Sequence, residues 1–308
     1  MKHYLLHLIL LVLVSGTAHA FDTVQVSDRV YALVGDLGQR SPDNLGHNMT
    51  SGFIVGDNGV AVVDPGACPT DAAAIEQAIR AVTEKPIRWV INTGAQDHRW
   101  LANGYFKTRG ARIVAATAAR EYMMANVERQ RTQITQLVGE ACGLSDPVYP
   151  DVTVNDSYHL PIRGVEVELR FTGGAHTPGD LFVWLPESKT LFSGDAVYVE
   201  RLLGIFPNGL RRWIVSLELI RDSLKPDIII PGHGRVTNLE EAMRDTYGYL
   251  TMLRDKISAR IADGAFDPVE AAEGLDQSEF AYLKNYDQLS FRAMNALRAA
   301  EELFRFEE

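Results

Sequence analysis

The stretch that decides the fold is Asn92-Thr93-Gly94-Ala95-Gln96-Asp97-His98-Arg99-Trp100. An apolar run at residues 87–91 leads into it, and residues 100–106 after it have the composition of a helix. Asp97 and His98, two residue types that bind metals, are adjacent at this junction, and strand-end loops often carry functional groups. Surface loops contain many Asp-His pairs, so this pair gains weight only from the rest of the chain.

Three later segments each place a His or an Asp among glycines or prolines, close to an apolar run. They are residues 174–180 with His176, residues 193–195 with Asp195, and residues 231–234 with His233. Taken singly, His176 before Thr-Pro-Gly is typical of a turn, and an Asp after Gly is typical of a turn acceptor. Each segment lies near a predicted strand, where functional groups are common, and together the three segments give weight to the Asp97-His98 pair.

This order of motifs, over roughly residues 30–235, resembles the metallo-β-lactamase-fold hydrolase superfamily. The metal motif of that family is His-x-His-x-Asp-His after a strand, followed by a His, a bridging Asp and a last His. The residues that fall where the family places its ligands are Asp97, His98, His176, Asp195 and His233. Residues 195–202 and the pair Arg212-Trp213 are similar to exported members associated with quinoprotein and thiosulfate-oxidation systems.

The chain departs from the family at the His-x-His pair, which is missing. Where the family has Asn-Thr-His-x-His-x-Asp-His, this chain has Asn-Thr-Gly-Ala-Gln-Asp-His. When Asp97 and His98 are aligned with the Asp-His of the family, this chain is one residue shorter. Gln96 takes the place of one lost His, or Ala95 does if the gap is placed differently. The family uses the lost pair and the counterpart of His176 for one metal, so the resemblance implies that this metal is absent.

The second metal position of the family survives, so the resemblance implies one metal ion with a water. Its expected ligands are Asp97, His98, Asp195 and His233, and zinc is the expected metal, with iron or manganese as alternatives. His176 is expected to be a weak additional ligand or a donor to the substrate. Asp64, at a tight turn, is expected to accept a hydrogen bond behind the ligands.

The predicted function is that of an exported metal-dependent hydrolase of a small-molecule ester, thioester, amide or lactam. Metal binding lowers the pKa of water, Asp195 would hold and deprotonate that water, and His176 would donate to an oxyanion or leaving group. The alternative is a degenerate, non-catalytic member that binds a ligand or partner, which the missing His-x-His pair favours. A sulfur-metabolism oxygenase is less favoured, because its iron uses the site that is lost.

Composition and the N-terminus restrict the partners and the compartment. The net charge of −10 argues against a nucleic-acid partner and against strongly anionic substrates. Residues 1–20 have the pattern of a signal peptide cleaved after Ala20, which predicts a periplasmic or secreted protein with no membrane contact after cleavage; an uncleaved anchor is the alternative. Cys68 and Cys142 are either a disulfide or two separate thiols.

Strand-like and helix-like segments alternate after an initial hairpin at residues 51–63. Together with the resemblance, this predicts an α/β (α+β) fold, an αββα four-layer sandwich of two mixed sheets with outer helices. We expect one metallo-β-lactamase-like domain at residues 21–308. Its residues 236–308 are expected to be a helical extension that packs on the domain or on a second copy in a homo-oligomer. Thr237 and Glu240 are a candidate capping box for its first helix.

Overall fold

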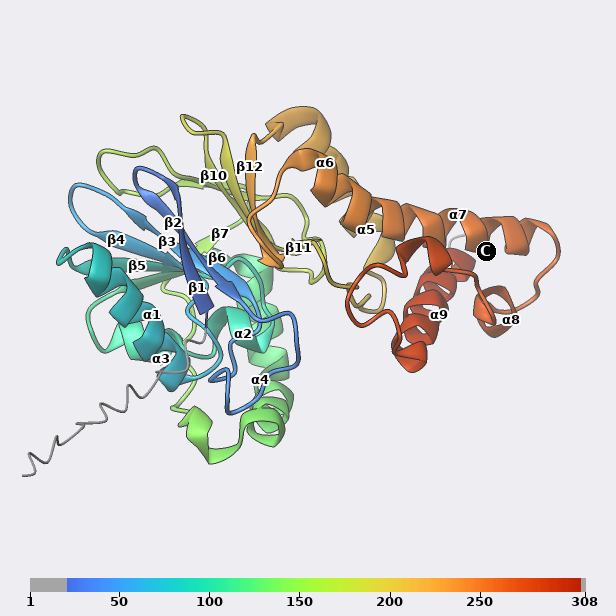
Figure 1. Ribbon diagram of the computed structural model, residues 1–308, viewed down its shortest axis with the longest axis horizontal. Coiled ribbons are helices and arrows are strands. Elements are labelled where there is room, and N and C mark those ends of the chain that lie inside the picture. The colour runs from blue at the N-terminus through green and yellow to red at the C-terminus, as the bar shows by residue number, and fades with distance from the viewer. Residues whose placement is uncertain (1–20, 306–308) are drawn as a thin grey trace, which may run out of the picture.

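The computed structural model describes residues 21–305, and the predicted signal peptide lies outside them (Figure 1). Two β-sheets form the centre of the molecule, and both are mixed, as predicted. The first is a seven-stranded sheet with its strands in sequence order: β1 (Phe21–Ser27), β2 (Val30–Gly35), β3 (Thr50–Val55), β4 (Val60–Val63), β5 (Ile87–Ile91), β6 (Arg112–Ala116) and β7 (Val152–Val154). Its first four strands pair antiparallel, and β4 to β7 pair parallel.

The second sheet has five strands in the order β12-β11-β10-β9-β8. These are β12 (Ile228–His233), β11 (Thr190–Tyr198), β10 (Leu181–Leu185), β9 (Glu168–Phe171) and β8 (Ser157–His159). Only β11 and β12 pair parallel. Strand β11 continues well beyond the apolar residues at its start, which end at Phe192. Ser193 and Asp195 interrupt the apolar pattern, yet all nine strand residues are buried between covering layers.

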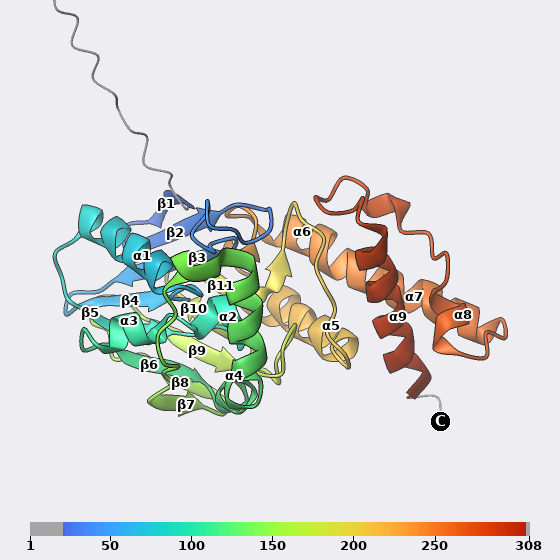
Figure 2. The same cartoon turned by 90° about the horizontal axis from the view of Figure 1, so that it is seen from below.

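Helices cover the outer faces of both sheets (Figures 1 and 2). On the side of the first sheet lie α1 (Pro69–Val82), α2 (Asp97–Trp100), α3 (Asn103–Lys107) and α4 (Thr117–Val138), the last continued by the 3-10 turn η1 (Gly139–Cys142). On the side of the second lie α5 (Leu210–Leu219) with the π-helical turn η2 (Ile220–Leu224), and α6 (Leu239–Ala242) with the π-helical turn η3 (Met243–Tyr247). The predicted αββα sandwich is therefore confirmed.

The strand alternation explains how one sheet serves two hydrophobic layers. In β2, Ala32 belongs to the cluster between the sheets, whereas Leu33 belongs to the cluster under α1. Successive side chains of a strand point to opposite faces, so the strands β2 to β6 each contribute to both layers. Val183 and Ile230 contribute to the inner cluster from the second sheet.

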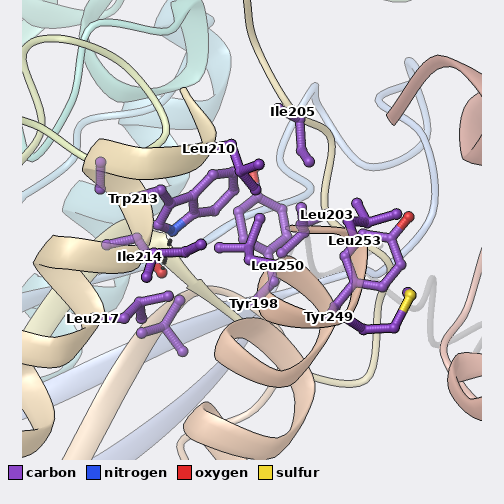
Figure 3. Packing of buried hydrophobic residues seen from close by; sticks show 14 of the residues in the cluster. Tyr198, Leu203, Ile205, Leu210, Trp213, Ile214, Leu217, Tyr249, Leu250 and Leu253 are labelled. Carbon is purple, nitrogen blue, oxygen red and sulfur yellow. Dashed lines mark hydrogen bonds between the residues drawn. The ribbon is translucent and has the colours of Figure 1, made fainter. Parts of the chain in front are cut away.

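The C-terminal helices extend the molecule on the side of α5 (Figure 1). They are α7 (Gly248–Ala262), α8 (Pro268–Ala272), the 3-10 turn η4 (Ser278–Phe280) and α9 (Leu289–Arg305). Figure 3 shows the packing they share with the sheet side of the molecule, where Tyr198 of β11 and Trp213 of α5 lie among Tyr249, Leu250 and Leu253 of α7. One buried cluster thus joins residues before and after residue 236.

Two local details concern the termini of helices. The N-cap of α6 is Asn238, whose side chain accepts a hydrogen bond from the amide of Glu241 at 3.0 Å, so the predicted capping box at Thr237 and Glu240 is wrong by one residue. Cys68 and Cys142 form a disulfide that links the start of α1 to the end of η1. No helix within residues 21–305 is long and apolar enough to cross a bilayer.

Candidate metal centre

His98, Asp195 and His233 converge from three elements at one end of the sheets. His98 is on α2 just after β5, Asp195 lies within β11, and His233 ends β12. One ligand atom of each lies within 4.8 Å of the others. The Nε2 atoms of His98 and His233 are 3.2 Å and 3.3 Å from the two carboxylate oxygens of Asp195. Three of the five predicted ligands therefore meet in space.

Both imidazoles are oriented by acceptors behind them. His98 Nδ1 lies 3.0 Å from Asp97 Oδ1, and His233 Nδ1 lies 2.7 Å from the carbonyl oxygen of Asn48. If each Nδ1 carries the proton, each Nε2 presents a lone pair towards Asp195, as in histidines that bind metals. Burial holds the pKa of His233 well below its usual value, which keeps that ring neutral at neutral pH.

These three groups suit a single zinc ion. Ligand atoms at about 2.0–2.2 Å from zinc in tetrahedral geometry lie about 3.3 Å from one another. Each Nε2 lies at this spacing from one oxygen of Asp195, His98 at 3.2 Å from Oδ2 and His233 at 3.3 Å from Oδ1. Two imidazoles and one carboxylate also leave a fourth position for water, which is the composition of a catalytic zinc site.

Asp97 is not part of this group. Its carboxylate pairs with Arg40 and accepts from the backbone amide of His98 at 2.8 Å and from the ring of His98. These contacts engage the Asp97 carboxylate with Arg40 and with the Nδ1 side of the His98 ring, whereas the Nε2 side of that ring faces Asp195. Burial alone would raise the pKa of Asp97, but Arg40 and His98 lower it, so the carboxylate is ionised and holds the His98 ring.

An alignment without a gap fits this geometry better than the one-residue shortening. The eight residues that start at Asn92 then match the eight positions of the family motif one for one. Gly94 and Gln96 stand at the His-x-His pair, His98 at the Asp, and Arg99 at the final His. The side chains of His98 and Arg99 do face Asp195.

Arg99 is a cation built into the centre, and the sequence predictions did not include it. Its side chain is fully buried and donates two hydrogen bonds to Asp195, from Nη2 to Oδ1 at 2.6 Å and from Nε to Oδ2 at 3.2 Å. Nη1 donates to Asp64 Oδ2 at 2.8 Å, and the carbonyl oxygens of Thr50 and Gly232 accept two further bonds. The ungapped alignment was the signal that could have found it.

The two carboxylates bound by Arg99 have distinct roles. Asp64 also accepts from the amide and hydroxyl of Thr93, both at 2.7 Å, so it is the hydrogen-bond acceptor that its turn position predicted. For Asp195, burial alone would raise the pKa, but Arg99 and then His98 hold it well below its usual value. Such a carboxylate is always ionised and is a weak base, which suits a ligand better than the predicted general base.

His176 lies beside the three-residue group without joining it. Its ring packs against Phe206 and Trp213, with centroids 4.7 Å and 4.8 Å away, and against Tyr198. Burial lowers the pKa of His176 to about 4, so the ring is neutral at neutral pH. Its Nδ1 is buried and has no hydrogen-bond partner among residues 21–305. His176 can therefore contact a ligand as a neutral donor or acceptor.

A cavity of about 200 Å³ opens onto these groups. The three histidines His98, His176 and His233 line one part of it. Gln96, at a position of the missing pair, also lines the cavity. Other parts of the wall are basic or apolar, and they are contributed by Arg40, Arg201, Ile205, Phe206, Phe291 and Arg298.

The first position of the missing pair is closed to a side chain. A Cβ atom added at Gly94 would lie 2.7 Å from Asp180 Oδ1. Asp180 is itself fixed, because its carboxylate accepts from the amide of Thr177 at 2.7 Å and from the Thr177 hydroxyl. The carboxylate of Asp180 thus fills space that a side chain at residue 94 would need.

Comparisons with known proteins identify the family and its relatives. The family model described as the metallo-beta-lactamase superfamily matches residues 46–233. A metallo-beta-lactamase type 2 from Pseudomonas aeruginosa is 24% identical over 166 residues, which are 53% of this chain and 63% of that protein. A beta-lactamase-like protein 2 homolog from Caenorhabditis elegans is 33% identical over 103 residues, 33% of this chain and 34% of that protein. The chain thus spans less than two thirds of these relatives.

Solved structures share the fold at low sequence identity. The sec-alkylsulfatase Pisa1 from Pseudomonas sp. superposes with a TM-score of 0.69 at 17% identity, covering 92% of this chain and 50% of that one. A metallo-beta-lactamase from Pontibacter korlensis gives a TM-score of 0.59 at 18% identity, covering 75% of this chain and 99% of that one. At such identities the likeness concerns the fold alone.

Proposed function

Because the chain belongs to the metallo-beta-lactamase superfamily, we propose that it is a hydrolase that uses one metal ion, zinc in the first instance, bound by His98, Asp195 and His233. The observation that carries the proposal is the convergence of these three ligand atoms within 4.8 Å. Substrates with an ester, thioester, amide or lactam bond fit this chemistry. Export to the periplasm or medium is part of the proposal, and the disulfide is compatible with an oxidising compartment.

Each residue of the centre has a defined task in this proposal. Asp97 and the carbonyl of Asn48 fix the tautomers of His98 and His233, so that their Nε2 atoms face the ion. Arg99 holds Asp195 in place from the opposite side. His176, a neutral ring beside the group, donates to the oxygen that gains charge in the substrate. A bound zinc ion would supply a water of lowered pKa as the nucleophile.

One observation favours a second candidate, a non-catalytic member that only binds a ligand. Arg99 already neutralises Asp195, and the carboxylate therefore has less charge to offer a metal ion. If Arg99 prevents metal binding, the cavity remains a binding site without a hydrolytic centre. Metal content separates the two candidates before any substrate is known.

The test is the metal content of protein produced with added zinc and measured by elemental analysis. We expect about one equivalent in the wild type, and almost none in His98→Ala and His233→Ala. Asp97→Asn should keep the stoichiometry at saturating zinc but weaken binding by about 10- to 100-fold, because it orients a ligand and is not one itself. His159→Ala, at the exposed edge strand β8, is the matched control.

Two results would contradict the proposal. A wild type without metal after growth in zinc would remove the metal centre, and an Asp97→Asn variant unable to bind zinc at any concentration would make Asp97 a ligand. Hydrolysis is then assayed with chromogenic esters, thioesters and cephalosporins. Zinc-loaded protein that cleaves none of these classes would support the binding candidate.

A further inference from the structure

The cavity next to the metal centre has an unbalanced charge. Arg40, Arg201 and Arg298 line it, and none of its lining residues within the described chain carries a carboxylate. The whole chain has a net charge of −10, so this basic wall is opposite in sign to the molecule. The acidic composition of the chain argued against strongly anionic substrates. The cavity itself is lined by basic residues, so the net charge of the chain does not describe it.

Two of the three arginines have no carboxylate partner. Arg40 pairs with Asp97 and is thereby neutralised. The Nη1 atom of Arg201 instead approaches the carbonyl oxygen of Gly38 and His233 Nδ1, both at 3.4 Å, and its Nε is buried without a hydrogen bond. Arg298 donates to the carbonyl oxygen of Ile205. Within residues 21–305 neither makes an ion pair.

An arginine that is half-buried without a counterion, as Arg201 and Arg298 are, is costly to the folded protein. A charged group that leaves water without a counterion loses hydration that nothing replaces. The planar fork of a guanidinium suits a carboxylate, which it binds with two parallel hydrogen bonds. A ligand with a carboxylate would therefore supply the counterion that Arg201 and Arg298 lack.

The remaining wall limits what that ligand can be. Phe206 lies next to His176, and Phe291 comes from α9. The cavity, of about 200 Å³, has room for a small molecule. The ligand that fits has an anionic end near the arginines and a compact apolar body against these rings.

We propose that Arg201 and Arg298 recognise the carboxylate of a small organic acid with an apolar body, and that this is the substrate class of the cavity. The proposal deepens the proposed function, because the same cavity contains the metal centre. It also gives the C-terminal helix α9 a role in specificity, since Phe291 and Arg298 lie outside the matched residues 46–233.

Binding of phenylacetate and of its neutral analogue phenylacetamide, measured by isothermal titration calorimetry, tests the proposal. We expect phenylacetate to bind at least about tenfold more tightly than the amide. The substitutions Arg201→Gln and Arg298→Gln should each weaken phenylacetate binding by about tenfold or more, with little effect on the amide. Arg292→Gln is the matched control, because Arg292 is on the same helix and stacks on Tyr286.

The titrations are carried out with protein as purified and again after zinc has been removed with a chelator. Retention of the preference for phenylacetate without zinc supports the arginines as its source, whether or not the protein proves to be a hydrolase. Equal affinity for phenylacetate and phenylacetamide would overturn the proposal. So would a preference for phenylacetate that is lost when zinc is removed, or an equal loss of phenylacetate affinity in Arg292→Gln. Thermal unfolding by circular dichroism verifies that the variants are folded.

Discussion

Arg99 determines the charge balance of the centre. It is fully buried and contacts two buried carboxylates, Asp64 and Asp195. Removal of one partner from a buried ion pair leaves uncompensated charge, which costs about 3–5 kcal/mol. We therefore expect Arg99→Met to lower the free energy of unfolding in urea at pH 7 by that amount. The exposed Arg254→Met, which loses only a pair with Asp255, should stay within about 0.5 kcal/mol.

The same variant should show a pH dependence of known sign. The pKa of Asp195 is lowered in the wild type, so its ionised form stabilises the fold above the unfolded pKa, and this contribution is lost as pH falls. Without Arg99, protonation of Asp195 instead relieves an unpaired charge. The stability difference between wild type and Arg99→Met should thus narrow from pH 7 to pH 4. A constant difference would contradict a charge-based role for Arg99.

At the level of single residues, the sequence predicted which residues converge better than it predicted their contacts. His98, Asp195 and His233 could be found because each lies close to an apolar strand and among residue types that form turns. The contacts of Asp97 could not be predicted, because its partner Arg40 is distant in sequence and no motif links the two residues. The basic wall of the cavity, to which Arg201 belongs, could not be predicted from the net charge, because the net charge is a sum over the whole chain.

At the level of elements, the disulfide joins two helices that are far apart in sequence. Cys68 and Cys142 are separated by 74 residues, and the link ties the start of α1 to the turn after α4. A cross-link of a loop this long stabilises a protein by about 4 kcal/mol in the chain-entropy estimate, with measured values of about 2–5. We expect dithiothreitol to lower the free energy of unfolding by that amount.

The control for this prediction is the double substitution of Cys68→Ser and Cys142→Ser. It should have the stability of the reduced wild type and should not respond to dithiothreitol. Alkylation of both thiols in unfolded, non-reduced protein, detected by mass spectrometry, would show that the bond is absent. The sequence showed which two cysteines could pair but did not show whether they do, because their spacing in the chain does not determine their distance in the fold.

Strands and helices were predicted well where apolar residues alternate regularly, as in the hairpin of β3 and β4. The predictions fail where tertiary packing or a side-chain hydrogen bond decides the local structure. Strand β11 continues through Ser193 and Asp195 because its neighbours bury it, although the pattern ends at Phe192. Asn238 caps α6 in place of Thr237, since its side chain reaches the amide of Glu241. Local patterns contain no information on such neighbours.

At the level of the molecule, the C-terminal helices are part of the main fold. Trp213, Tyr198 and Tyr249 belong to one buried cluster that spans the second sheet, α5, α7 and α9 (Figure 3). We therefore expect one cooperative transition in urea, with coincident midpoints by tryptophan fluorescence and far-UV circular dichroism. Two separated transitions would show that residues 236–308 unfold as an independent unit.

The position of the Asp180 carboxylate next to Gly94 means that the order of mutations would matter if a His-x-His pair were introduced into this chain. A histidine introduced first at residue 94 would collide with the Asp180 carboxylate, which a Cβ atom there would approach to 2.7 Å. A smaller side chain at residue 180 would have to come before it. Directed evolution towards a binuclear enzyme therefore has to start in the loop after β9, away from the motif that it seeks to rebuild.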